Sequence, residues 1–139
     1  MKGKDIRILL VDDHDLVLQG LKRIVECSLP EIKNVCTASS GYEVGLLAAS
    51  QHFDLFVLDM ELPDVSGLEL ISTLRNLDPQ ACILVNTMHE EIWYIKNLLQ
   101  CGVNGILFKS TDSGKITEAI RRVLAGETYY CPYAEHVRT

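Results

Sequence analysis

The sequence predicts an α/β fold, a doubly wound five-stranded parallel sheet flanked by five helices. Five short apolar runs, each four to six residues long, are spread along the chain. Each run is followed by a segment in which apolar residues recur at the spacing of an amphipathic helix. Strands of a parallel sheet are buried on both faces and therefore appear as continuous apolar runs. The regular alternation and the short connections favour a parallel sheet with helices on both faces.

The first half of the chain supplies three strands and three helices. The first apolar run, Ile6 to Val11, ends in two acids, and the helical pattern that starts at Asp15 is stopped by Pro30. The third run, Phe53 to Leu58, ends at an acid and is followed by a glycine that allows a turn into the next helix. We expect strands at 6–11, 35–38 and 53–58, and helices from 15 to the proline, at 41–50 and at 68–77.

The second half repeats the alternation twice. Strands are expected at 82–85 and 105–108 and helices at 90–100 and 116–125, the last one capped by Asp112 or Ser113. Gly102 and Gly126 close these helices. Residues 127–139 show no clear periodicity, so we interpret them as a tail or the start of a linker. The predicted domain therefore covers residues 1–126.

Composition restricts the function classes. The 139 residues are 47% hydrophobic and 23% charged, which is typical of one globular domain. A net charge of −6 is unfavourable for nucleic-acid binding by this domain alone. There is no apolar run of membrane-spanning length and no signal peptide at the start, so we expect a cytoplasmic protein with no membrane contact. The five cysteines form no CxxC pair and are interpreted as free thiols.

Polar side chains stand where four of the strands end. Asp12 and Asp13 follow the first strand, Asp59 the third, Thr87 the fourth and Lys109 the fifth. Ligands of open α/β sheets bind outside the carboxyl ends of the strands, at the point where the strand order reverses. In a flavodoxin-like order, 2-1-3-4-5, that point lies between the first and third strands. All five side chains would then converge on one crevice.

The chemistry of this set favours phosphoryl transfer. Three neighbouring carboxylates repel one another unless a cation joins them. Mg²⁺ prefers oxygen ligands and is usually held by one or two carboxylates together with waters and phosphate oxygens. An aspartate nucleophile, a metal ion, an ammonium group and a hydroxyl together form a site in which Asp59 attacks while Lys109 and the metal neutralise the phosphoryl oxygens.

These motifs resemble the receiver domain of two-component response regulators over nearly the whole chain. The sequence VDD at residues 11–13, the pattern D-x-x-L-P-x-x-x-G from Asp59 to Gly67, and the later threonine and lysine fall in the family's order and spacing. The resemblance implies that Asp59 accepts a phosphoryl group from a sensor histidine kinase. It also implies roles for the other site residues: Asp12, Asp13 and Asp59 as Mg²⁺ ligands with the backbone carbonyl of Glu61, Thr87 as the switch hydroxyl, and Lys109 as the phosphoryl-binding ammonium.

A narrower resemblance concerns the subgroup. The sequence VDDHDLVLQGL at residues 11–21 is similar to the opening of the NarL/LuxR-type response regulators. Members of this group carry a C-terminal helix-turn-helix domain, which is absent from this chain. The resemblance implies that DNA is contacted only through such a domain, and that phosphorylation promotes a homodimer.

Two positions depart from the family pattern, and two more lie at positions where the family varies. Ile106 stands where the family has a switch tyrosine or phenylalanine, and Met88 stands where a small residue is usual. Glu61 and His89 lie two residues after the phosphoacceptor and the switch threonine. In the family, these two positions tune the lifetime of the phosphoryl group, and we expect them to rim the pocket.

Two other readings stay open. Glu61 stands where an aspartate-nucleophile phosphatase has its general acid, although the chain has no cap domain and its first acid pair fits a receiver better. A stand-alone or phosphorylation-independent receiver could act as a docking module. A dinucleotide-binding domain is excluded, since the first turn reads DDHDLV and has no glycine loop. As a phosphoacceptor, the domain is expected to be a self-phosphorylating and autodephosphorylating switch and not a turnover enzyme on small substrates.

Overall fold

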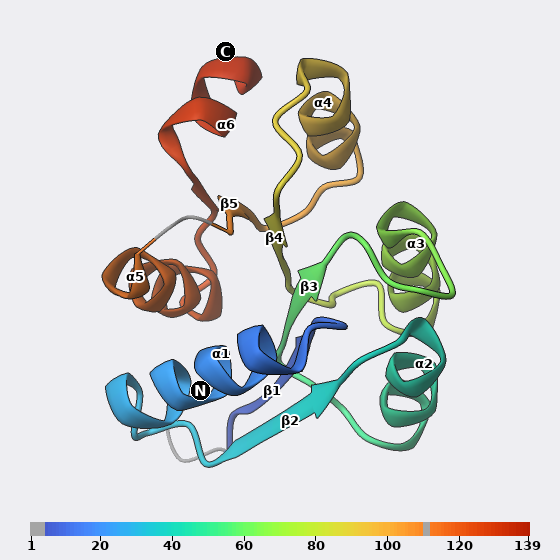
Figure 1. Ribbon diagram of the computed structural model, residues 1–139, viewed down its shortest axis with the longest axis vertical. Coiled ribbons are helices and arrows are strands. Elements are labelled where there is room, and N and C mark those ends of the chain that lie inside the picture. Colours follow the sequence, from blue (N-terminus) through green and yellow to red (C-terminus); the bar gives the residue numbers. More distant parts are fainter. Residues whose placement is uncertain (1–4, 110–111) are drawn as a thin grey trace.

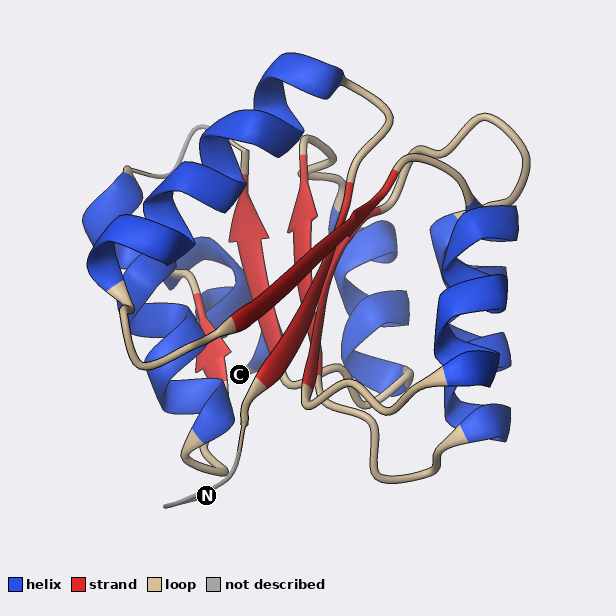
Figure 2. Cartoon of the chain, turned by 90° about the horizontal axis from the view of Figure 1, so that it is seen from below, coloured by secondary structure: helices blue, strands red, loops and turns tan. Residues whose placement is uncertain are grey.

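A computed structural model, which describes residues 5–109 and 112–139, shows one parallel sheet between two layers of helices (Figures 1 and 2). The strand order is β2-β1-β3-β4-β5-β6. The first five strands therefore have the predicted order 2-1-3-4-5. The strands are β1 (Arg7–Val11), β2 (Asn34–Ala38), β3 (Leu55–Asp59), β4 (Ile83–Thr87), β5 (Gly105–Phe108) and β6 (Tyr129–Tyr130), and the helices are α1 (Asp15–Ser28), α2 (Gly41–Ser50), α3 (Gly67–Leu77), α4 (Ile92–Gln100), α5 (Ser113–Leu124) and α6 (Pro132–Arg138).

The continuous apolar runs fill two cores, one on each face of the sheet. Alternate residues of a strand point to opposite faces, so Leu9 and Val11 enter one core while Ile8 and Leu10 enter the other. The first core is covered by α2, α3, α4 and α6, and the second by α1 and α5. Figure 1 shows this division, with α1 and α5 on one side of the strands. Helices on both faces explain why the strands read as unbroken apolar runs.

The structure adds a sixth strand and a sixth helix to the five of each that we predicted. Residues 127–139, which we expected to lack regular structure, contain β6 and α6. β6 pairs in parallel with β5, Gly105 opposite Tyr129 and Ile106 opposite Tyr130. α6 begins at Pro132, whose fixed φ suits the first turn of a helix. A two-residue strand is too short to give a periodic signal, and this is why the sequence pattern missed it. That this segment leads into a linker stays a prediction.

Side-chain caps fix where three of the helices begin. Ser40 accepts a hydrogen bond from the backbone of Glu43, and Ser66 forms a capping box with Glu69 at the start of α3. Asp112, one of the two predicted caps of α5, accepts from the backbone of Lys115. These caps satisfy backbone N–H groups that a helix leaves unpaired at its first turn. They hold α2, α3 and α5 close to the carboxyl ends of the strands that precede them.

Asp64 joins the loop after β3 to the start of α2. Its two carboxylate oxygens accept hydrogen bonds from the backbone of Gly41 at 2.8 Å and of Tyr42 at 3.0 Å. These bonds favour the charged form and lower the pKa of the carboxyl group below its usual value.

Asp64→Ala is therefore expected to lower the thermal unfolding temperature at neutral pH. A carboxylate whose pKa is lowered by folding stabilises the protein above its unfolded pKa, and this stabilisation is lost as the pH falls through its folded pKa. The difference between wild type and variant, measured by circular dichroism, should thus shrink in acid. An equal difference at all pH values would contradict a charged cap, and Glu31→Ala, at another exposed acid, is the control.

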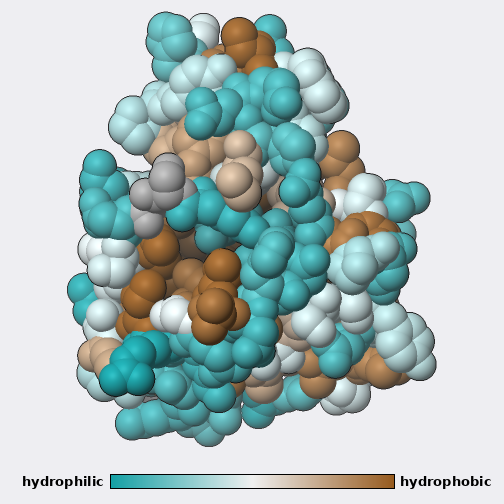
Figure 3. All heavy atoms as spheres, in the orientation of Figure 1, coloured by the Kyte–Doolittle hydropathy of each residue, from teal (hydrophilic) through white to brown (hydrophobic). Residues whose placement is uncertain are grey.

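The face of the molecule seen in Figure 3 is mostly hydrophilic, with hydrophobic atoms in separate groups. Large apolar side chains that are exposed include Leu16 in the first turn of α1, and Met88, Ile92 and Trp93 around the start of α4. Trp93 is exposed while Tyr94 is buried, as expected for neighbours on one helix. None of the described helices combines the length and hydrophobicity that a membrane crossing requires.

Candidate functional site

The predicted polar residues meet at the carboxyl edge of the sheet. Asp12 directly follows β1, Asp59 and Thr87 are the last residues of β3 and β4, and Lys109 directly follows β5. β1, β3, β4 and β5 are consecutive neighbours in the sheet, so their carboxyl ends lie side by side. Asp12 and Thr87 are 1% exposed and Asp59 is 3% exposed. The strands thus deliver four polar side chains into a largely buried crevice.

Lys109 bridges two buried acids. Its ammonium nitrogen lies 3.0 Å from Oδ2 of Asp12 and 3.1 Å from Oδ1 of Asp59. Burial by itself lowers the pKa of Lys109, but the hydrogen bonds and charges of the two acids outweigh it and raise that pKa. The lysine is therefore a permanent positive charge at physiological pH, held between two carboxylates.

Asp59 has one engaged and one free oxygen. Oδ1 binds Lys109 and accepts a hydrogen bond from the backbone N–H of Glu61 at 3.2 Å. Oδ2 is buried and has no hydrogen-bond partner among the described residues. Burial raises the pKa of this carboxyl group, and the charge of Asp12 adds to the rise, while Glu61 and Lys109 oppose it. A buried polar atom without a partner is costly, and such an atom in a crevice points to a group that binds there.

The acids could hold a hard cation. Asp12, Asp13, His14 and Asp59 each offer a ligand atom, and these atoms lie within 4.8 Å of one another. Asp13 is exposed, and the imidazole Nδ1 of His14 lies 3.0 Å from its Oδ1. Together with the partnerless Oδ2 of Asp59, this cluster of carboxylate oxygens fits Mg²⁺. The backbone of Glu61 lies beside Asp59, and the role of its carbonyl as a ligand stays a prediction.

Thr87 begins the loop between β4 and α4. Its hydroxyl oxygen accepts a hydrogen bond from the backbone N–H of His89 at 3.0 Å, which turns the loop back toward the strand end. A hydroxyl that accepts one bond still has a proton to donate to a ligand oxygen in the crevice.

Asn86 is a further polar residue of the site, and our sequence analysis gave it no role. It is 5% exposed, lies opposite Asp59 in the register of β3 and β4, and its Oδ1 has no hydrogen-bond partner among the described residues. Its signal in the sequence is a polar residue that follows the apolar run of residues 82–85 and directly precedes Thr87.

An ion pair spans the loops after β3 and β4. The imidazole Nε2 of His89 binds the carboxylate of Glu61, and Nδ1 lies 3.3 Å from Oε1 of Glu91. The ring of His89 packs against Tyr94 with centroids 4.8 Å apart. Burial lowers the pKa of His89, but the hydrogen bond and charge of Glu61, with those of Glu91, raise it overall. The two predicted rim residues therefore contact each other across the crevice.

Met88 and Ile106, the other two unusual positions, differ in exposure. Met88 is 72% exposed and, with Glu90, Phe108 and Lys109, lines a hollow of about 340 Å³ beside the site. Ile106 is fully buried in the centre of β5, where β4 and β6 flank it on both sides. Its side chain belongs to the core that α2, α3, α4 and α6 cover, and not to the surface beside the crevice.

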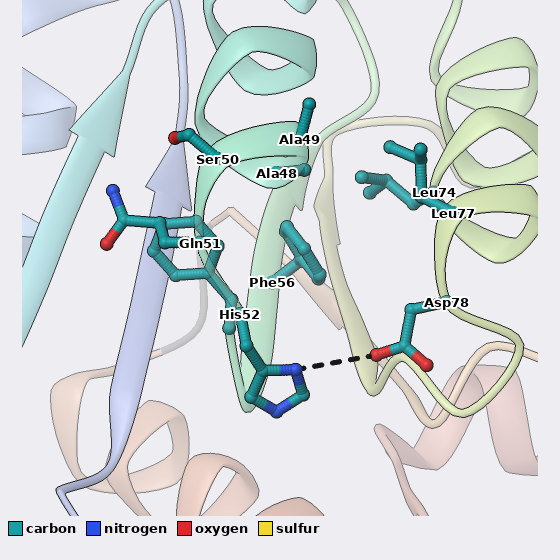
Figure 4. Close-up of a pocket in the computed structure, with 10 residues that line it drawn as sticks. Ala48, Ala49, Ser50, Gln51, His52, Phe56, Leu74, Leu77 and Asp78 are labelled. Carbon is teal, nitrogen blue, oxygen red and sulfur yellow. Dashed lines mark ion pairs between the residues drawn. The ribbon is translucent and has the colours of Figure 1, made fainter.

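A second hollow lies outside the site. It has a volume of about 410 Å³ and is formed by the ends of α2 and α3 with Phe53 and Phe56 of the β3 segment, where His52 faces Asp78 at 3.7 Å (Figure 4). None of the strand-end acids, Thr87 or Lys109 lines it.

Comparison with known proteins identifies the family. The model of the response regulator receiver domain matches residues 8–121. Response regulator GacA of Pseudomonas protegens is 35% identical over 127 residues, which are 91% of this chain and 59% of GacA. Response regulator UvrY of Escherichia coli is 33% identical over 124 residues, which are 89% of this chain and 56% of UvrY. The chain thus spans a little over half the length of these curated relatives.

Solved structures of response regulators have the same fold as this chain. A two-component response regulator of the LuxR family from Aurantimonas sp. SI85-9A1 is 32% identical, with a TM-score of 0.87 over 96% of this chain and 94% of that one. The isolated receiver domain of RcsB from Salmonella enterica, solved with the phosphomimetic BeF₃⁻, has a TM-score of 0.88 over 96% of this chain and 99% of that one. At 18% identity, the RcsB likeness shows the fold alone.

The five strand-end residues on a parallel sheet of this order define a receiver domain of a two-component system. The chain belongs to the response regulator receiver domain family, and its similar sequences are response regulators of the GacA, UvrY and DegU type, in the NarL/LuxR family.

Proposed function

We propose that Asp59 accepts a phosphoryl group from the phosphohistidine of a sensor histidine kinase. The observation that carries this proposal is the buried, partnerless Oδ2 of Asp59 beside the Lys109 ammonium. Oδ2 forms the new bond to phosphorus, the phosphorus–nitrogen bond of the donor breaks, and the electron pair stays on the imidazole that leaves. Because Oδ1 is held by Lys109 and by the Glu61 N–H, the carboxylate is oriented before the donor arrives.

The other site residues support the transfer of the phosphoryl group to Asp59. Lys109 can turn from Asp12 toward the incoming phosphoryl oxygens, and Thr87 can donate its hydroxyl proton to one of them. Asp12, Asp13, Asp59 and the Glu61 carbonyl would hold Mg²⁺, which supplies positive charge to the phosphoryl oxygens when it is bound.

The proposal is tested with a small phosphodonor such as acetyl phosphate. Incubation of the protein with donor and Mg²⁺ should add one phosphoryl group, measured by intact-protein mass spectrometry, and removal of Mg²⁺ by a chelator should prevent the addition. An unchanged mass in the presence of Mg²⁺ would contradict the proposal, and so would the rapid turnover of small phosphoesters without a labelled protein.

The output of the domain is a second part of the proposal. Phosphorylation would favour one arrangement of the loop after β4 and of α4, and so change the partners of the surface around α4, β5 and α5. Membership of the family supports three further parts of the proposal. They are a phosphorylation-dependent homodimer, control of a LuxR-type DNA-binding domain in a longer protein, and a cytoplasmic location. Sedimentation velocity with and without BeF₃⁻ tests the homodimer, and identical profiles at high protein concentration would remove its support.

Glu61 and His89 are expected to shorten the life of the phosphorylated state. Both side chains lie at the rim of the crevice and can orient the water that hydrolyses the acyl phosphate. Glu61→Ala and His89→Ala should each lengthen the half-life by roughly ten- to a hundredfold, if each orients water as a general base would. The decay of the phosphorylated mass after donor removal measures this. Half-lives within error of wild type would show that neither residue contacts the reacting water.

Met88 is expected to act by its bulk. Met88→Ala should speed both loading and loss of the phosphoryl group, because a smaller side chain beside Lys109 widens access to the crevice. The same mass measurement follows both rates, and a change in one direction only would argue against a steric role.

A further inference from the structure

The C-terminal segment contacts the loop after β4 and the last residue of β5. The hydroxyl of Tyr133, in the first turn of α6, donates a hydrogen bond to the backbone carbonyl of Glu90 at 2.8 Å. Its ring packs against Phe108 with centroids 5.8 Å apart. Glu90 directly follows the rim residue His89, and Phe108 directly precedes Lys109. Figure 1 shows α6 standing beside α4, above the ends of β4 and β5.

The position where the family has its switch tyrosine or phenylalanine holds a buried isoleucine here, so another side chain must couple the loop after β4 to β5. Ile106 is fully buried, and β6 covers the side of β5 that faces away from β4. Phe108 and Tyr133 are the aromatic pair that reaches from β5 to the loop after β4. Tyr133 is 36% exposed, so it lies at the surface and has room to move.

We propose that Tyr133 is a positioning residue that holds the loop of residues 88–90 in the arrangement belonging to free Asp59, so that release of this hydrogen bond and phosphorylation favour each other. The inference rests on the proposed function of Asp59. In this role, α6 is an internal restraint on residues 88–90, the switch loop.

The direction of the effect follows from the crowding at Asp59. The residue is 3% exposed, and the Glu61–His89 ion pair spans the loops beside it. A phosphoryl group on Asp59 adds volume and negative charge near residue 61, whose backbone N–H already binds Asp59. This charge repels the Glu61 carboxylate and attracts the His89 imidazolium, which favours separation of the pair. His89 then moves together with Glu90, whose carbonyl is tied to Tyr133. The hollow between Met88, Glu90, Phe108 and Lys109, about 340 Å³, gives the loop space to shift.

Linkage makes the effect reciprocal. A bond that is stronger in the free state lowers the affinity for any ligand that favours the other state, and the ligand weakens the bond by the same factor. A hydrogen bond of ordinary net strength corresponds to a factor of roughly two to ten in such an equilibrium. This factor is the expected size of the Tyr133 effect.

The test is the affinity for beryllofluoride, a phosphoryl mimic, in the presence of Mg²⁺. Trp93, the single tryptophan, lies against Tyr94 on α4, so its fluorescence is expected to change when α4 shifts on binding. Tyr133→Phe removes the hydroxyl and keeps the ring, and it should bind beryllofluoride about two- to tenfold more tightly than wild type.

Hydrogen exchange of the α6 backbone amides is a second measurement. In wild type, beryllofluoride should speed this exchange. In Tyr133→Phe, these amides should exchange fast already without it.

Tyr130→Phe is the matched control. The Tyr130 hydroxyl donates to the carbonyl of Val103 at 3.0 Å, so its loss loosens the same segment without touching the switch loop. Its beryllofluoride affinity should equal that of wild type. Equal affinities of wild type and Tyr133→Phe, or weaker binding by Tyr133→Phe, would overturn the inference. Failure of wild type to bind beryllofluoride at all would instead contradict the proposed function.

Discussion

Asp59→Asn is expected to abolish phosphoryl loading and to leave the protein folded, with an unchanged or higher unfolding temperature. Loading is lost because an amide oxygen is a poor nucleophile, and among the described residues no other acid at this edge has a buried oxygen without a partner. The fold is kept because Asn removes a buried negative charge that lies beside Asp12. The Asp12–Lys109 ion pair, at 3.0 Å, remains intact.

Two measurements separate these effects. Intact mass after incubation with acetyl phosphate and Mg²⁺ gives the loading, and thermal unfolding without Mg²⁺ gives the stability. Asp64→Asn, in the same loop but turned toward α2, is the matched control and should still load. Labelling of Asp59→Asn at the wild-type level would show that another residue is the phosphoacceptor. A large loss of stability would show that the Asp59 carboxylate is a structural group.

Lys109→Ala is expected to slow loading by about a hundredfold or more, the usual effect of removing one donor from a developing negative charge. It also leaves Asp12 and Asp59 without their shared ammonium group, at 3.0 and 3.1 Å. Breaking a buried ion pair by removing one partner costs about 3 kcal/mol or more when the remaining charges stay buried. The variant should therefore unfold at a lower temperature, and Mg²⁺ should restore part of the loss, because the cation joins the same acids.

The rate of loading and the Mg²⁺ dependence of unfolding check this prediction. Lys96→Ala, which removes an exposed lysine of α4, is the control and should change neither quantity. A loading rate for Lys109→Ala within a factor of two of wild type would mean that the lysine has only a structural role. Unfolding that does not respond to Mg²⁺ would mean that the acids do not form the metal site.

Much of the fold could be predicted because its signals are local. Each strand that is buried on both faces leaves a continuous apolar run, and each helix leaves a periodic one, so the first five strands and helices appeared close to their observed bounds. The strand-end acids were predictable for a related reason. Asp59 interrupts an apolar run at the point where parallel strands deliver their ligands, and its neighbours Thr87 and Lys109 do the same on adjacent strands.

The sequence by itself determined the fold class and five polar residues at the strand ends, because a buried strand and the point where it ends both leave a local signal. The strand order 2-1-3-4-5 was expected from the flavodoxin-like fold, and the buried Asn86 of the same site was missed. Tertiary structure decided the rest. β6 and α6 form because the edge of β5 and the side of α4 offer partners, which no local pattern reports. The pairing of Glu61 with His89, the partnerless Oδ2 of Asp59 and the bond from Tyr133 to Glu90 each join residues from different loops. Such contacts depend on how the loops lie in space, and only the folded chain brings them together.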